Sequence, residues 1–97
     1  MRLDDKRRIE KEIVEIFRKY NRIGLIRPSI NFRRYENGTN LIEIDCSTFD
    51  INYRLMYDLS VLLQTQEIDI NRDHYAYDSC SGDITELIIT TDMEIYY

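Results

Sequence analysis

Residues 30–46 read INFRRYENGTNLIEIDC, and the spacing of their apolar side chains decides how two strands pair. A two-residue turn at the Asn-Gly dipeptide would place Phe32 and Ile42 on opposite faces of the hairpin. A three-residue loop, with the glycine in the left-handed region, pairs Phe32 with Ile42 and Ile30 with Ile44. Only this second register gathers the apolar side chains on one face, because a one-residue slip moves every side chain to the other face. We therefore predict a β-hairpin with a type I turn and a glycine bulge.

A helix is predicted before this hairpin. Apolar residues recur from Ile9 to Tyr20 at the spacing i, i+4, i+7, i+8 and i+11. This spacing places them on one stripe of a helix. Asp4 or Asp5 is expected to cap the first turn, and Gly24 is expected to end the helix.

A second helix and a second hairpin are predicted after residue 46. Ser47, Thr48 or Asp50 is expected to cap the helix. Its predicted buried stripe consists of Ile51, Leu55, Met56, Leu59, Leu62 and Leu63. A strand over residues 67–77, a turn over 78–82 and a strand over 84–91 follow, and a continuation of the last strand to Ile95 is left open.

The resulting order αββαββ predicts a single two-layer α+β domain spanning residues 1–97. Both helices would cover one face of a four-stranded antiparallel sheet. Right-handed crossovers give the spatial strand order 3-4-2-1, which is equivalent to a circularly permuted ferredoxin-like sheet. The most apolar runs, LIEI and ELIIT, are expected in the centre, while INFRRY and EIDINRDHY are expected at the edges.

Composition excludes some classes of protein. No apolar run approaches the roughly 20 residues that span a bilayer, so no membrane partner is expected. The first residues, MRLDDKRRIEKE, lack the uncharged apolar stretch of a secretory signal, so a cytoplasmic protein is expected. Two cysteines are too few for a disulfide framework, and the three glycines form no phosphate-binding loop.

The charges divide the chain into a basic and an acidic part. Residues 1–34 carry eleven Lys/Arg and five Asp/Glu, whereas residues 35–97 carry two Lys/Arg and thirteen Asp/Glu. Such a distribution biases the choice of partner more than the choice of fold.

The acidic part suggests a protein-binding surface. Its acids share the predicted sheet with tyrosines, which supply rigid contact area with a polar tip. The predicted partner-binding residues are Glu43, Asp45, Asp69, Asp73, Tyr75, Tyr77 and Glu86. The leading hypothesis is a non-enzymatic inhibitor or regulator that docks this face on a basic protein. The basic target could be a nucleic-acid-handling protein. This suggestion is an analogy, because immunity and anti-defence proteins that block such targets are also small and acidic.

The basic part offers an alternative, a regulator that binds nucleic acid through the first helix and the first hairpin. The residues of this alternative are Arg7, Arg8, Lys11, Arg18, Arg33 and Arg34. The acidic remainder disfavours direct contact with a long polyanion, and i,i+4 ion pairs such as Arg8–Glu12 and Lys11–Glu15 would give a merely solvated face. Self-association is also open, because the basic helix of one chain can meet the acidic sheet of another in a homodimer.

A second alternative is a small enzyme or metal-binding protein that uses His74 and Cys80. The acidic stretch around Cys80 disfavours the thiolate that a catalytic cysteine needs. The carboxylates nearby match no calcium loop, and no paired CxxC or HxxxH is present for zinc. We therefore expect no catalytic residue, no metal site and no cofactor.

Overall fold

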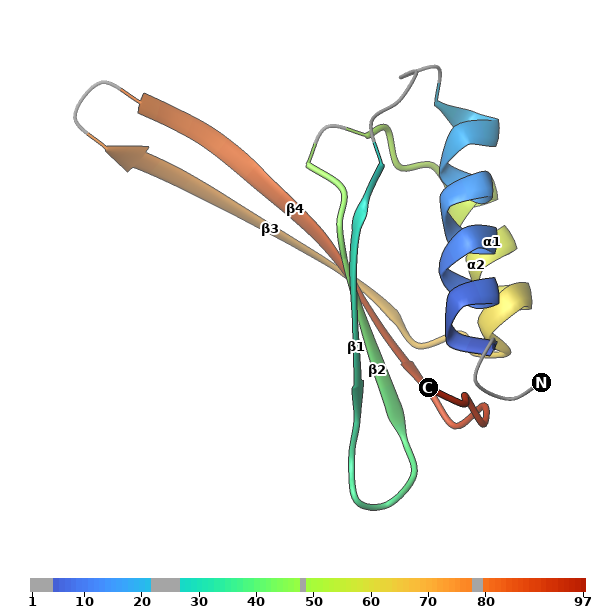
Figure 1. Ribbon diagram of the computed structural model, residues 1–97. Coiled ribbons are helices and arrows are strands. Elements are labelled where there is room, and N and C mark those ends of the chain that lie inside the picture. Colours follow the sequence, from blue (N-terminus) through green and yellow to red (C-terminus); the bar gives the residue numbers. More distant parts are fainter. Residues whose placement is uncertain (1–4, 22–26, 48, 78–79) are drawn as a thin grey trace.

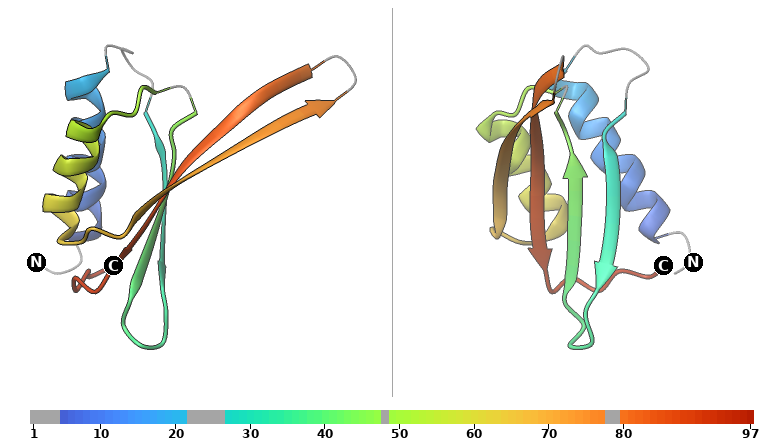
Figure 2. Two further views of the ribbon diagram at one scale, coloured as in Figure 1. Left: turned by 180° about the vertical axis from the view of Figure 1, so that it is seen from behind. Right: turned by 90° about the vertical axis from the view of Figure 1, so that its left-hand side faces the viewer.

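The protein is described by a computed structural model, which covers residues 5–21, 27–47, 49–77 and 80–97, and the side chains outside residues 73–83. The elements, in chain order, are α1 (Asp5–Tyr20), β1 (Ser29–Arg34), β2 (Asn40–Asp45), α2 (Tyr53–Leu63), β3 (Ile68–Tyr77) and β4 (Cys80–Thr91). Both helices lie on one face of the sheet, as predicted, so that the fold is a two-layer α+β arrangement (Figures 1 and 2).

The four strands pair antiparallel in the order β1-β2-β4-β3, which is the predicted order. The two most apolar strands, β2 and β4, are therefore central. In the first hairpin Phe32 pairs with Ile42 and Ile30 pairs with Ile44, which is the register predicted from the alternation of apolar side chains. Gly38 has a φ of 90°, a backbone conformation that residues with a Cβ atom rarely adopt. The prediction of a three-residue loop with a left-handed glycine is confirmed.

The core lies between the sheet and the helix layer. The centres of the predicted helical stripes are confirmed, because Ile9, Ile13 and Phe17 of α1 and Leu55, Leu59 and Leu63 of α2 are buried. The other predicted members are half-buried, and Ile51 lies before α2 begins: Ile16, Tyr20, Ile51, Met56 and Leu62. Facing them, the sheet contributes Phe32, Ile42, Ile44, Leu87 and Ile89. The rings of Phe17 and Phe49 meet edge to face with centroids 5.2 Å apart, a favourable aromatic geometry.

The predicted caps differ from the observed ones. The cap of α2 is Asn52, whose side chain accepts a hydrogen bond from the Leu55 backbone N–H at 2.9 Å. Ser47 and Asp50 are wrong as caps because α2 begins only at Tyr53, so that both residues lie before the cap position. Ser47 bonds to Asp45, and the Asp50 N–H donates to Asn21. Asp4, Gly24 and Thr48 lie outside the described residues.

The second hairpin is longer than predicted. β4 begins at Cys80 rather than near residue 84, and β3 ends at Tyr77, so the connection is shorter than the predicted turn over 78–82. The outer part of this hairpin projects away from the helices and from the other two strands (Figures 1 and 2). The molecule is accordingly elongated, with principal extents of 47 × 30 × 23 Å.

The last residues do not continue β4, which ends at Thr91. They turn back across the end of the sheet toward the start of α1 (Figure 2, right). Ile95 is fully buried in the core, and the Lys6 N–H donates to the Tyr96 carbonyl at 3.0 Å. The continuation of the strand to Ile95 is therefore wrong, because the segment turns across the end of the sheet and places the Ile95 side chain in the core.

Candidate functional site

The face of the sheet opposite the helices brings together four of the acids singled out in the sequence. Glu43 and Asp69 flank Ile88 in one cross-strand row, since both pair with Ile88 in register. Asp45 and Glu86 pair with each other in the next row. We call Glu43, Asp45, Asp69 and Glu86, with Ile88 half-buried between them, the acidic face.

The four acids of the acidic face differ in what they contact. Glu43 forms an ion pair with Arg33 at 3.3 Å, from Oε1 to Nε. Asp45 accepts from the Ser47 hydroxyl at 2.8 Å and from its backbone N–H at 3.2 Å. Within the described residues Asp69 and Glu86 have neither a side-chain hydrogen bond nor an ion pair. These two carboxylates are therefore available to a partner.

The pairing of Asp45 with Glu86 is unfavourable for the isolated chain. These acids lie directly opposite one another on the two central strands. Like charges at such positions destabilise a sheet. A cation placed over the pair from outside would relieve the repulsion.

The remaining predicted partner-binding residues are Asp73, Tyr75 and Tyr77. Their backbone belongs to β3, an edge strand, and shares the strand parity of Asp69. Their side chains lie outside the described residues, so their part in the acidic face stays a prediction.

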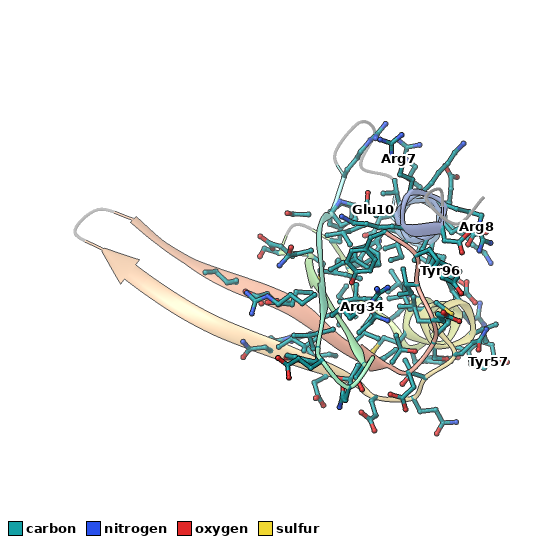
Figure 3. All side chains as sticks on the ribbon, turned by 60° about the horizontal axis from the view of Figure 1, so that its bottom comes forward. Arg7, Arg8, Glu10, Arg34, Tyr57 and Tyr96 are labelled. Carbon is teal, nitrogen blue, oxygen red and sulfur yellow. The ribbon has the colours of Figure 1, made fainter. Side chains whose placement is uncertain are left out.

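The basic residues of the nucleic-acid alternative do not form one surface. Arg7 and Arg8 leave α1 in different directions (Figure 3). Arg33 is paired with Glu43 on the acidic face, whereas Arg34 donates to the Ile95 carbonyl and lies 4.5 Å from the centre of the Tyr97 ring. Arg34 thus fastens the C-terminal residues to β1.

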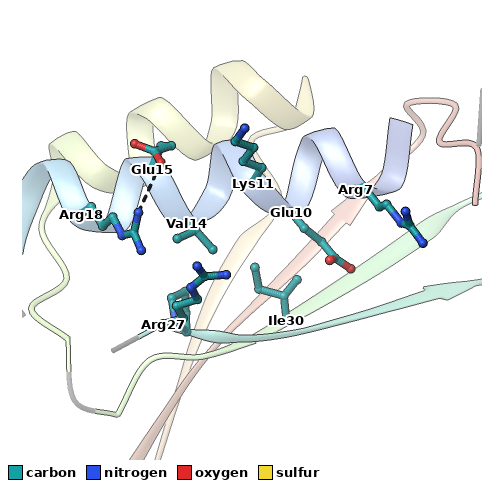
Figure 4. A pocket seen from close by; sticks show the side chains of 9 residues that line it. Arg7, Glu10, Lys11, Val14, Glu15, Arg18, Arg27 and Ile30 are labelled. Atoms are coloured by element: carbon teal, nitrogen blue, oxygen red, sulfur yellow. Dashed lines mark ion pairs between the residues drawn. The ribbon is translucent and has the colours of Figure 1, made fainter. Parts of the chain in front are cut away.

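The remaining arginines and the lysine of this set lie on α1. Arg8 pairs with Glu12 at 4.0 Å, as predicted. Glu15, however, pairs with Arg18 at 3.5 Å, so the predicted Lys11–Glu15 pair is wrong. Lys11 is left exposed on a groove beside β1, to which Arg7, Arg18 and Arg27 also contribute (Figure 4).

The described residues supply neither a reactive thiol nor a group of metal ligands. Cys46 is fully buried, and this burial raises the pKa of its thiol to about 11, with a further contribution from Asp45. A thiol with such a pKa is protonated at neutral pH and is a poor nucleophile. Among the described residues no group of three His, Cys, Asp or Glu side chains is close enough to hold a metal ion. The side chains of His74 and Cys80 lie outside that part of the chain.

Two surface features were not expected from the sequence. Tyr53, Tyr57 and Val61 form an exposed stripe on α2, with 77%, 66% and 60% of their surface accessible. The predicted buried stripe of this helix includes none of these three residues, and no sequence pattern indicated an apolar outer surface. Arg27 joins the groove beside α1 through tertiary structure, and no local pattern marks it.

No family model, curated protein or solved structure matches this chain. The relation of its sheet to a circularly permuted ferredoxin-like sheet therefore stays a prediction. None of the helices among the described residues is long and apolar enough to cross a membrane.

Proposed function

We propose that the protein is a non-enzymatic, cytoplasmic binding module that docks its acidic face on a basic surface of another protein. The observation that carries this proposal is the direct opposition of Asp45 and Glu86 on the two central strands. The arrangement costs stability in the isolated chain, and a cationic side chain from a partner would turn that cost into binding energy. Residues that lower stability in this way are characteristic of functional sites.

The anatomy of the acidic face supports docking on a protein. Ile88 supplies an apolar centre, and Glu43, Asp69 and Glu86 surround it as a charged rim. Protein interfaces commonly have this arrangement of an apolar centre inside a polar rim. Acids at the rim also accelerate the encounter with a basic partner. An inhibitor or regulator of a nucleic-acid-handling protein remains the form of this function that best fits the charge.

Charge reversal at the two available acids tests the proposal. Each of three proteins, wild type, Asp69→Lys/Glu86→Lys and the matched control Glu36→Lys/Glu94→Lys, is used for affinity capture from native lysate with quantitative mass spectrometry. We expect a basic protein to be captured by the wild type and the control, and to fall about tenfold or more with the acidic-face variant. The control undergoes the same change in net charge at exposed residues away from the acidic face.

For the acidic-face variant, we expect partner capture to fall but folding stability to rise. Lysine at position 86 would face Asp45 and replace a repulsive pair with an attractive one, so that the free energy of unfolding should rise by about 0.5 kcal/mol. Urea denaturation measures this change. Equal capture by all three proteins would refute the proposed docking, and a fall in stability would show that Asp45 and Glu86 do not repel.

A further inference from the structure

A second surface with different chemistry lies on the opposite edge of the sheet from β3. A groove of about 430 Å³ runs between α1 and the edge strand β1 (Figure 4). Its floor is apolar, because Val14, Pro28 and Ile30 are buried or half-buried there. Its rim carries four exposed cationic side chains, those of Arg7, Lys11, Arg18 and Arg27.

The positive charge of this rim is only partly neutralised by the chain itself. Glu15 also lines the groove, but it is paired with Arg18 at 3.5 Å. The other acid of the lining, Glu10, is paired with Lys6 at 3.9 Å. Arg7, Lys11 and Arg27 have no ion-pair partner within the described ranges. The groove therefore offers three unpaired cations above an apolar floor.

The backbone of β1 adds directional hydrogen-bonding groups along the free edge of the sheet, where Ile30 lines the groove. In an antiparallel pair, alternate residues turn their N–H and C=O groups toward the neighbouring strand. The Tyr35 N–H donates to the Thr39 carbonyl at 2.8 Å, so residues 33 and 31 face β2 as well. Ile30 and Phe32 then direct their N–H and C=O groups to the free edge of the sheet. Such an edge can accept an additional strand.

We propose that the groove between α1 and β1 binds an extended acidic peptide, which pairs with the β1 backbone at Ile30 and Phe32 and places its carboxylates against Arg7, Lys11 and Arg27. Apolar side chains at alternate peptide positions fit over the floor of the groove, since alternate side chains of a strand project to the same side. Pro28 lacks an N–H and limits the pairing at one end. Only a few backbone hydrogen bonds can form between the peptide and β1, so the cationic rim and the apolar floor of the groove provide much of the selectivity. This groove is separate from the acidic face, and the inference does not depend on the proposed function.

Two other occupants fit the groove less well. A second copy of the chain could offer its own edge strand β3, but the exposed Arg72 shares the strand parity of Ile70 and would meet the basic rim. A nucleic acid cannot space its phosphates to fit three separate cations, and it offers no amide backbone to pair with the edge of β1. An acidic peptide avoids both conflicts, because its carboxylates can be spaced to match the cations.

A backbone-resolved NMR titration tests the inference. The probe is a peptide that repeats Glu-Thr-Val-Thr, which as a strand places glutamate and valine on one side and threonine on the other. We expect saturable shifts at Ile30, Phe32 and Lys11, and about tenfold weaker binding to the variant Lys11→Glu/Arg27→Glu. The matched control Arg8→Glu/Arg54→Glu reverses two charges outside the groove and should bind the peptide nearly as well as the wild type.

Three further probes separate this mode of binding from its competitors. A peptide with N-methyl groups at alternate residues keeps its charge but cannot form a ladder, so we expect its binding to be lost. A peptide with lysine in place of glutamate should not bind. Equal binding of the N-methylated peptide, stronger binding of oligothymidylate, or no saturable shifts up to millimolar peptide would overturn the inference. Self-association of the wild type that is abolished in Lys11→Glu/Arg27→Glu would also overturn it, by making a second copy the occupant.

Discussion

Asn21 shows how a single polar side chain connects parts of the chain that are distant in sequence. It is buried, and its amide N–H groups donate to the carbonyls of Phe17 and Asp50 at 3.1 Å and 3.2 Å. Its amide oxygen accepts from the Asp50 N–H at 2.7 Å. One asparagine thereby joins the end of α1 to the segment that leads into α2, and it satisfies backbone groups that neither helix can pair.

Replacing this asparagine should destabilise the fold. In Asn21→Ala the Asp50 N–H loses its partner in a partly buried place, so we expect the free energy of unfolding to fall by about 1–3 kcal/mol. Asn31→Ala, which truncates an exposed asparagine of β1, serves as the control and should change stability by less than about 0.5 kcal/mol. Urea denaturation followed by circular dichroism compares the two. Equal urea midpoints for the two variants would mean that the hydrogen bonds of Asn21 make no net contribution to the free energy of unfolding.

The residue scale also shows what the sequence could predict. The pairing of Phe32 with Ile42 was predictable because parity within one hairpin is a local property. The role of Asn21 was not, because its partner Asp50 is 29 residues away and no periodicity relates them. The same reason applies to Arg27, which reaches the groove only after α1 has packed on the sheet.

At the scale of elements, α1 and α2 are joined by a polar cluster on their outer side. The Tyr20 hydroxyl donates to Asp58 at 2.7 Å, and the Lys19 ammonium lies 3.3 Å from the same carboxylate. The hydrogen bond from Tyr20 lowers the pKa of Asp58, Lys19 lowers it further, and desolvation acts in the opposite direction. The ionised form of Asp58 is therefore preferred in the folded state.

This preference predicts a pH-dependent contribution to stability. Because the pKa of Asp58 is lower in the folded than in the unfolded state, its contribution is present above the unfolded value of about 4 and is lost as the pH falls through the folded value. Asp58→Asn should be less stable than the wild type near neutral pH, and the difference should shrink below about pH 4. Urea denaturation at several pH values measures this difference in stability, and Asp69→Asn, which changes an exposed carboxylate, serves as the control. A difference that stays constant with pH would contradict the assigned role of Asp58.

Element boundaries were less predictable than element types. The buried stripes of both helices followed from spacing alone, since a helix repeats its faces with a fixed period. The cap of α2 did not, because Ser47, Asp50 and Asn52 all have suitable side chains. The choice depends on where the helix begins: α2 starts at Tyr53, which places Asn52 at the cap position. The Ser47 hydroxyl instead donates to Asp45 and accepts from the Thr85 N–H, and the Asp50 N–H donates to Asn21.

At the scale of the whole molecule, charge is separated between two surfaces. The acidic face lies on the side of the sheet without helices, and the basic rim of the groove lies on α1 beside β1 (Figures 1 and 4). The sequence indicates this division, because residues 1–34 carry eleven of the thirteen Lys/Arg and residues 35–97 carry thirteen of the eighteen Asp/Glu. It could not predict that Arg33 and Arg34 would be removed from the basic surface, since the ion pair with Glu43 and the bond to the Ile95 carbonyl arise only on folding.

The C-terminal residues close the molecule at the end of the sheet where α1 begins. Ile95 is fully buried, and the Asn40 side chain holds this segment by donating to the Met93 carbonyl at 3.0 Å and accepting from the Tyr97 hydroxyl at 2.9 Å. The segment thus contributes apolar contacts to the core and hydrogen bonds to β2. These contacts make the last residues part of the fold.

Truncation of the Ile95 side chain should therefore lower the stability of the entire domain. Ile95→Ala removes buried methyl and methylene groups and leaves a cavity, so we expect the free energy of unfolding to fall by about 2–5 kcal/mol. The neighbouring Glu94→Ala alters an exposed side chain and should change stability by less than about 0.5 kcal/mol. Urea denaturation followed by circular dichroism measures both variants, and the loss in Ile95→Ala should appear as one cooperative transition at a lower midpoint. An unchanged midpoint would show that the C-terminal residues do not pack against the core, whereas a separate early transition would show that they pack but unfold independently of the sheet.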